Sequence, residues 1–178
     1  MGTRHLIQVI DNEGEMKVAQ YGQFDGYPSG MGVRTLFYAT YHLKEIERGL
    51  KRVRWASEEE VEVIYAKYPQ ANYLGTEDCE NLELLYPNLV RETSADVLMT
   101  IAYSVGEVLL VDNREFANDE LYCEGIYTIN YQTNMFTSMY NGTTWELKLD
   151  ELPEHTEYLE LYKKAVEMAE ENKKDEDD

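Results

Sequence analysis

The 178-residue sequence has little cysteine and no long apolar run. Its two cysteines, Cys79 and Cys123, are too few for the disulfide frameworks that hold small secreted domains together. No apolar stretch approaches the roughly 18 residues that suggest a membrane-spanning helix, and the N-terminus lacks the basic segment and apolar stretch of a signal peptide. We therefore expect a cytoplasmic protein in a reducing compartment, with no membrane contact.

The histidines and cysteines also lack the spacing of a metal site. His5, His42 and His155 have no companions at ligand spacing, and the two cysteines stand apart from each other. Cys123 precedes Glu124, whose charge would raise the pKa of the thiol and disfavour a nucleophilic cysteine. We expect neither a metal nor a cofactor, and no catalytic motif of a known enzyme class is present.

Positive charge is scarce and unevenly placed. The chain has 16 basic and 35 acidic residues, a formal net charge of −19. Residues 1–56 hold six acids and eight bases, residues 57–150 eighteen and four, and residues 151–178 eleven and four. The N-terminal third is the expected place for an anionic ligand, because the remaining surface would repel one; direct nucleic-acid binding is not expected. The structural alternative is a solvated helix and following turn that carry these charges, namely Lys44, Arg48, Lys51, Arg52 and Arg54.

What is present suffices for one globular domain. Hydrophobic residues make up 43% and aromatic residues 12% of the chain, enough to close a core despite the charge. The length fits a single domain, which we assign to residues 1–172. Residues 173–178 are expected to form a charged, disordered tail.

The start of the chain predicts a hairpin, a shaped loop and a helix. Residues 3–10 and 16–21 are apolar or alternating segments around a turn-rich stretch, as in a β-hairpin. Four glycines and a proline in residues 22–32 exclude a regular helix or a central strand. Apolar residues at three- and four-residue steps then predict a helix over residues 33–49.

The rest of the chain predicts helices, then strands, then a last helix. Ser57 and Glu60 form a capping-box pattern at the start of a short helix, and a further helix starts at Thr93. Residues 69–90 are interpreted as an irregular connection. Strands are expected at 107–112, 121–131, 134–142 and 144–149, and an amphipathic helix at 153–172. This order indicates an α+β domain with mostly antiparallel strand pairing.

The glycine-rich loop and the first strand supply the candidate site. Gly30 to Gly32 lead into the predicted helix, so free backbone N–H groups and the helix dipole could receive an anion there. A loop that only turns the corner between hairpin and helix is the structural alternative. The candidate ligand-binding residues are Arg4, His5, Gln20, Tyr21, Gln23, Asp25, Tyr27 and Ser29.

Tyrosine is abundant, with 15 residues against four phenylalanines. Tyrosine rings could stack on a planar ligand while their hydroxyls bond its edge, although tyrosines at the rim of a modest core would give the same composition. The tyrosines considered for such a pocket are Tyr21, Tyr27, Tyr38, Tyr41, Tyr122 and Tyr127.

The opening block resembles a known family. Residues 1–6 (MGTRHL) and 17–30 (KVAQYGQFDGYPSG) are similar to the start of proteins found in phages, bacteria and fungi, a family without a settled activity. Residues 91–98 and 122–127 resemble later segments of that family, with Ser94 in place of a glycine. The resemblance fits a phage-encoded protein acting in the host cytoplasm.

Three functions stay open. The leading hypothesis is a protein that binds, and sequesters, a small anionic, planar or nucleotide-like ligand. The second is a hydrolase-like enzyme with His5 or Asp25 as acid or base; its layout is similar in outline to N-terminal-nucleophile hydrolases, although Gly2 offers no nucleophile and trimming to Thr3 would be needed. The third is an acidic inhibitor or DNA mimic that binds a basic host protein through residues 57–178. A homo-oligomer is compatible with each.

Overall fold

The computed structural model describes residues 2–71, 73 and 75–176. The strands in this part of the chain are β1 (His5–Ile10), β2 (Met16–Gly22), β3 (Val53–Trp55), β4 (Val108–Leu110), β5 (Gly125–Asn130), β6 (Met135–Tyr140) and β7 (Thr143–Lys148). The α-helices are α1 (Val33–Gly49), α2 (Glu58–Lys67), α3 (Glu77–Leu85), α4 (Val97–Tyr103) and α5 (His155–Glu176). A π-helical turn, Pro28–Gly32, leads into α1, and a 3-10 turn, Ser94–Asp96, leads into α4.

The main sheet has five strands in the order β2-β1-β5-β6-β7. The predicted hairpin is confirmed, since β1 and β2 pair antiparallel, as do β5 with β6 and β6 with β7. β1 and β5 run parallel, with His5 opposite Gly125 and Ile10 opposite Asn130. β3 and β4 form a separate parallel pair. The prediction of an α+β domain with a mostly antiparallel sheet is therefore confirmed.

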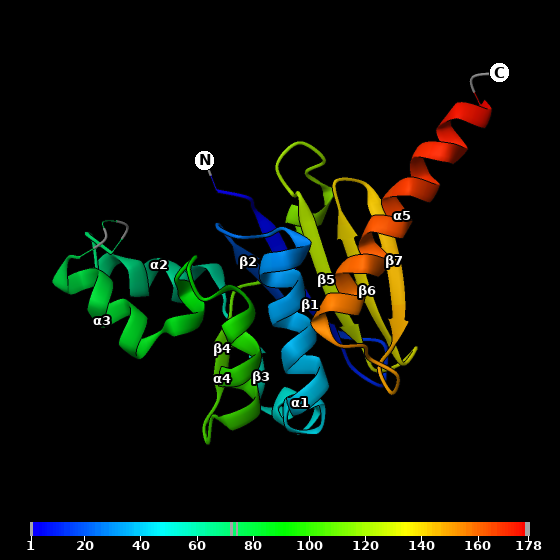
Figure 1. Cartoon of the computed structure of the whole chain (residues 1–178). Helices are drawn as coiled ribbons and strands as arrows, with labels where there is room; N and C mark the ends of the chain where they lie inside the picture. Colours follow the sequence, from blue (N-terminus) through cyan, green and yellow to red (C-terminus); the bar gives the residue numbers. More distant parts are fainter. Residues whose placement is uncertain (1, 72, 74, 177–178) are drawn as a thin grey trace.

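Helices α1 and α5 cover one face of this sheet (Figure 1). Ile7 and Val9 of β1 and Tyr127 of β5 belong to one buried cluster, and each is fully shielded from solvent. Tyr158 of α5 is also fully buried, and its hydroxyl hydrogen-bonds the hydroxyl of Ser138 at 2.9 Å. Because a buried hydroxyl needs such a partner, this contact fixes α5 on the sheet as well as filling the core.

A second, smaller core lies in the α2–α3 lobe, which we define as residues 58–92. Its centre consists of buried apolar side chains, among them Ile64, Leu82 and Leu89. Leu109 of β4 packs against this cluster, so the lobe is joined to the rest of the domain through β4. The lobe stands beside α4 and β4, on the side of the molecule away from α5 (Figure 1).

The helices of this lobe test two predictions. The capping box is confirmed, because the Ser57 hydroxyl accepts the Glu60 N–H at 3.1 Å and the Glu60 carboxylate accepts the Ser57 N–H at 2.9 Å. The expected irregular connection over residues 69–90 is wrong, because α3 lies within it. Its first turn is fixed by Thr76, whose hydroxyl accepts the Cys79 N–H at 3.2 Å.

Element ends differ from the predictions in two places. The strand expected from residue 121 starts at Gly125, because the chain first turns back and the Cys123 N–H bonds the Asp119 carbonyl at 2.8 Å. α5 continues through Glu176 and thus includes residues 173–176 of the expected tail, while residues 177 and 178 lie outside the described part. None of the described helices is apolar over enough of its length to cross a membrane.

Candidate functional site

Arg4, just before β1, lies against an aromatic ring. Its guanidinium carbon is 4.1 Å from the ring centroid of Tyr122, a cation–π contact. Its backbone N–H donates to a carboxylate oxygen of Glu124 at 2.9 Å. The side-chain Nε is buried and has no hydrogen-bond partner among the described residues, and the ion pairs in this part of the chain do not include Arg4. The guanidinium therefore lacks an anionic partner within the described part of the chain.

Tyr21 of β2 lies near this arginine. Its hydroxyl donates to the Gln23 side-chain oxygen at 2.5 Å, and its ring meets Phe116 edge-on with 5.0 Å between the centroids. Burial raises the pKa of Tyr21, and the positive charges of Arg4 and Arg91 oppose that shift. The hydroxyl is therefore protonated near neutral pH, in the field of two arginines. We call Arg4, Tyr21, Gln23, Phe116 and Tyr122 the Arg4 cluster.

His5, the next residue, has different surroundings. It is completely buried, and its Nε2 hydrogen-bonds the hydroxyl of Ser94. The backbones of Gly22 and Gly26 pack on its ring, so that a Cβ at position 22 would come within 2.2 Å of the imidazole. Burial lowers the pKa of His5 to about 4, so the ring is neutral at pH 7. The hydrogen bond of His5 to Ser94 therefore lies in the interior of the protein.

Asp25, Tyr27 and Ser29 lie on the outside of the glycine-rich loop. All three are exposed, and the Tyr27 hydroxyl donates to an Asp25 carboxylate oxygen at 2.9 Å. This hydrogen bond raises the pKa of Tyr27. Asp25 has a φ of 57°, in the left-handed region that Asp tolerates better than most residues. The pair therefore stabilises an exposed turn, and the charge of Asp25 opposes in part the effect of burial on the pKa of His5.

The expected anion cradle before α1 is wrong in one respect, because its N–H groups are not free. The N–H of Gly30 bonds the Tyr27 carbonyl at 2.9 Å, that of Met31 the Asp25 carbonyl at 2.8 Å, and that of Gly32 the Tyr27 carbonyl at 3.4 Å. The π-helical turn thus uses its own carbonyls to satisfy these donors. These bonds fit the structural alternative, in which the loop turns the corner between hairpin and helix.

Gln20 is the one remaining candidate. It is buried, and its side-chain amide donates to the backbone carbonyl of Tyr21 at 3.3 Å. With Tyr21 it lines a pocket of about 160 Å³ at the free edge of β2, whose other walls include Asn113 and Arg91. Asn113 also blocks that edge, because its N–H bonds the Ala19 carbonyl at 3.2 Å and its side-chain oxygen accepts the Tyr21 N–H at 3.3 Å.

The eight predicted residues therefore fall into separate groups. Arg4 contacts Tyr122, which the sequence also suggested as a pocket tyrosine, and Tyr21, bonded to Gln23, lies in the field of Arg4. His5 lies in the interior, Gln20 lies at the edge pocket, and Asp25, Tyr27 and Ser29 lie on the outer loop. Sequence reasoning missed Phe116, whose segment carries no motif, and it noted Arg91 only as the start of the family-like segment 91–98 and not as a site residue.

Comparison with known proteins adds no assignment. The chain matches no family model, no curated protein and no solved structure. The resemblance of its opening block to a phage, bacterial and fungal family stays a prediction, and the function has to be argued from the geometry of the site.

Proposed function

We propose that the protein binds a small ligand combining a negative charge with a planar ring, as in a nucleotide, at the Arg4 cluster. The observation that carries this proposal is the guanidinium of Arg4, stacked on Tyr122 without a carboxylate partner in a chain with a net charge of −19. By contrast, Arg34, Arg54 and Arg114 hold carboxylate oxygens at 2.6, 2.8 and 2.7 Å.

The chemistry of the cluster suits such a ligand. A phosphate or carboxylate would accept hydrogen bonds from Arg4, and charge-assisted bonds of this kind are stronger than neutral ones. Tyr122 is 43% exposed, which leaves ring surface for stacking. The Gln23 side chain, already bonded to the Tyr21 hydroxyl, offers an amide to the edge of a base. The positive charge of Arg4 attracts an anion that much of the acidic surface repels, while Arg91 nearby is paired with Glu92 at 2.8 Å.

Binding without turnover is the better-supported form of this activity. An acid or base must reach the substrate within hydrogen-bond distance, and the buried His5 is bonded to Ser94. Asp25, the other proposed acid or base, lies on the outer loop and bonds Tyr27. The carboxylate next to the Arg4 cluster, that of Glu124, is engaged with the Arg4 backbone N–H at 2.9 Å, and the cluster contains no histidine. A protein of this design holds a ligand and sequesters it.

The test uses ATP, adenosine and inorganic phosphate as probes in isothermal titration calorimetry. ATP should bind more tightly than adenosine or phosphate alone, and Arg4→Gln should weaken ATP binding by about tenfold or more, as expected for a lost charge-assisted bond. Arg48→Gln, a matched loss of one positive charge at a side chain 73% exposed on α1, should leave it unchanged. No binding of ATP, or equal losses in the two variants, would refute the proposal.

A second measurement separates binding from catalysis. Protein kept with ATP, desalted and then denatured should release ATP unchanged, as determined by mass spectrometry. Recovery of ADP or AMP, together with its loss in Arg4→Gln, would instead show that the cluster supports hydrolysis.

A further inference from the structure

A groove of about 530 Å³ separates the α2–α3 lobe from α4 and β4. Its walls include Val63 and Ile64 of α2, Leu85 at the end of α3, and Leu109 of β4, with Asn88 between them. We call this the lobe groove. It shares none of its lining with the Arg4 cluster, although Asn88 also lines the edge pocket to which Tyr21 belongs.

The walls of the lobe groove leave apolar surface in contact with water. Val63 is 50% and Leu85 59% exposed, and the neighbouring Leu84 is 78% exposed. Single exposed apolar residues are ordinary, but several beside one concave surface indicate a binding site. The volume is within the range of sites that enclose small ligands or a few side chains.

A buried polar group in the groove lacks a partner. Asn88 is only 6% exposed and lines the groove, and its side-chain oxygen has no hydrogen-bond partner among the described residues. Its amide nitrogen makes one long contact, 3.5 Å to the carbonyl of Leu109. Because a buried acceptor without a donor is destabilising, an occupant that supplies an N–H group would be favoured here.

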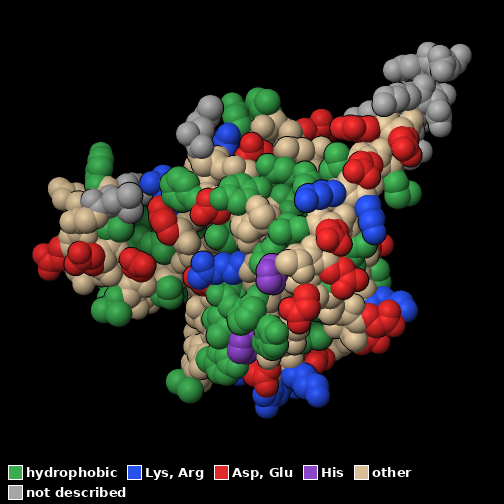
Figure 2. All heavy atoms as spheres, viewed as in Figure 1, with side chains coloured by type: hydrophobic (Ala, Val, Ile, Leu, Met, Phe, Trp, Pro, Cys, Tyr) green, Lys and Arg blue, Asp and Glu red, His purple; other side chains and the backbone are tan. Residues whose placement is uncertain are grey.

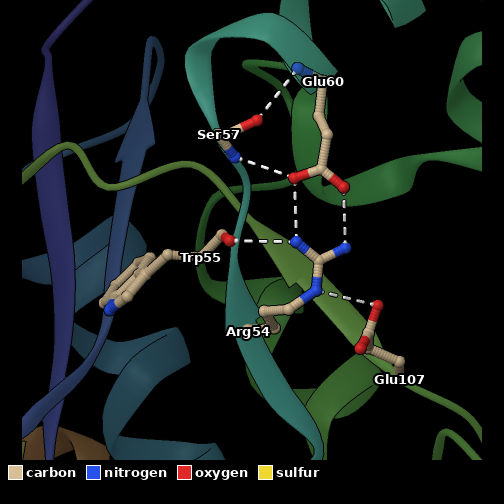
Figure 3. A network of polar contacts seen from close by, with 5 residues as sticks. All are labelled: Arg54, Trp55, Ser57, Glu60 and Glu107. Carbon is tan, nitrogen blue, oxygen red and sulfur yellow. Dashed lines mark hydrogen bonds and ion pairs between the residues drawn. The ribbon is translucent and has the colours of Figure 1, made fainter.

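The rim of the groove is acidic, although it includes an arginine (Figure 3). Both terminal nitrogens of Arg54 donate to Glu60, at 2.8 and 2.9 Å, and its Nε pairs with Glu107 at 3.1 Å. One terminal nitrogen also bonds the carbonyl of Trp55 at 3.2 Å. The guanidinium is thus engaged on all three nitrogens, while two carboxylates face one positive charge. Arg54 therefore has no free N–H group for an anion, and the second carboxylate beside it favours a cation.

The lobe around the groove also carries mostly negative charge. Residues 57–92 contain nine acidic and two basic residues. The lobe, at the left of Figure 2, shows acidic side chains next to hydrophobic ones. Negative charge around an apolar groove complements a segment that is apolar on one side and basic on the other.

We propose that the lobe groove docks a basic, amphipathic segment of a partner protein. Apolar side chains of that segment would lie between Val63 and Leu85, an N–H group would bond the Asn88 oxygen, and Lys or Arg side chains would lie near Glu60 and Glu107. This assigns a site to the basic partner that the acidic region predicts. It does not depend on the ligand of the Arg4 cluster.

The test uses a fluorescent synthetic peptide of Leu and Lys, arranged so that the leucines form one helix face. Fluorescence anisotropy compares it with a peptide of the same composition in shuffled order. The amphipathic peptide should bind about tenfold more tightly than the shuffled one, since only it presents an apolar face to the groove. Its binding should persist in part at about 0.5 M salt, where attraction between surface charges is screened.

Variants locate the contact. Val63→Glu and Leu85→Glu should each weaken binding by about tenfold, as expected at the centre of an interface. Met168→Glu on α5, where the side chain is 63% exposed, adds the same charge and should not weaken it. Because extra negative charge alone would strengthen binding of a basic peptide, a loss in the first two variants reports the apolar contact.

Asn88→Leu gives an independent readout. Removal of the unpartnered acceptor should keep or raise the melting temperature while it lowers peptide affinity severalfold. Equal binding of the two peptides, or no larger loss in Val63→Glu and Leu85→Glu than in Met168→Glu, would overturn the proposal. In either case Arg4→Gln should leave peptide binding unchanged, which separates this result from the test of the Arg4 cluster.

Discussion

At the scale of single residues, the buried His5 should make stability depend on pH. Its pKa is about 4 in the folded protein and about 6.5 when unfolded, because burial disfavours the charged ring. The unfolded chain therefore binds the proton more readily, and stability from this residue is complete above pH 6.5 and falls as the pH drops toward 4. In urea denaturation, the contribution of His5 to the free energy of unfolding should fall by about 2 kcal/mol as the pH is lowered from about 7.5 to about 5.

Two variants isolate this contribution from the many carboxylates. His5→Gln should remove that part of the pH dependence, even if it is less stable at every pH. His155→Gln, at an exposed position at the start of α5, should retain it. If wild type and His5→Gln lose equal stability over this pH range, the histidine is not the cause.

At the scale of elements, the start of α2 combines several polar contacts on one carboxylate. Arg54 and the Ser57 N–H both bond Glu60, and the Arg54 hydrogen bonds lower the pKa of Glu60 to about 2. Ser57→Ala should destabilise α2 by about 1 kcal/mol, because the Glu60 N–H loses its acceptor. Hydrogen exchange of the α2 amides should become correspondingly faster, while exchange in β1 and β5 stays close to that of the wild type.

The control for this cap is Ser29→Ala. Ser29 is exposed in the π-helical turn before α1, where no side-chain cap bond is present. In Ser29→Ala, hydrogen exchange of the α2 amides should match that of the wild type. Equal exchange of the α2 amides in Ser57→Ala and the wild type would show that the Glu60–Arg54 contacts alone hold the first turn.

The elements that sequence reasoning found are those with local signals. The β1–β2 hairpin has a turn-rich centre, α1 has helical periodicity, and α2 has its capping box. α3 was missed because Pro69, Gly75 and Pro87 dominate its surroundings. Thr76 followed by three acids in the first turn was the signal that could have revealed it. The parallel pairing of β1 with β5 has no local signal.

In the candidate site, too, sequence reasoning found the residues that have a local signal. Arg4, Tyr21 and Gln23 were predicted because they lie in or beside a recognisable loop. Phe116 and Arg91 reach them from distant parts of the chain, and only the fold brings them close. Alternation along a strand correctly separates Arg4 from His5, but it does not reveal that the backbone of the loop would bury the histidine.

For the whole molecule, the net charge of −19 should make salt stabilising. Acidic side chains are spread over the face seen in Figure 2, and their mutual repulsion favours expansion of the chain. Exposed ion pairs also weaken in salt, but each contributes little. The melting temperature should therefore rise by about a few degrees between about 10 mM and 500 mM sodium chloride, as measured by circular dichroism. A falling melting temperature would show that the ion pairs outweigh the repulsion.

The parallel pairing of β1 with β5 also determines when the protein can fold during synthesis. The hairpin leaves the ribosome well before β5, the partner of its inner strand, which begins at Gly125. Until that segment emerges, the nascent chain has an unpaired β1 edge and no β5-β6-β7 meander beside it. Bringing β5 to β1 closes a long loop, which costs chain entropy before the contacts between the two strands form. Assembly of the sheet is therefore a late and slow step. A chain stalled before β5 would thus depend on chaperones to shield its first strand.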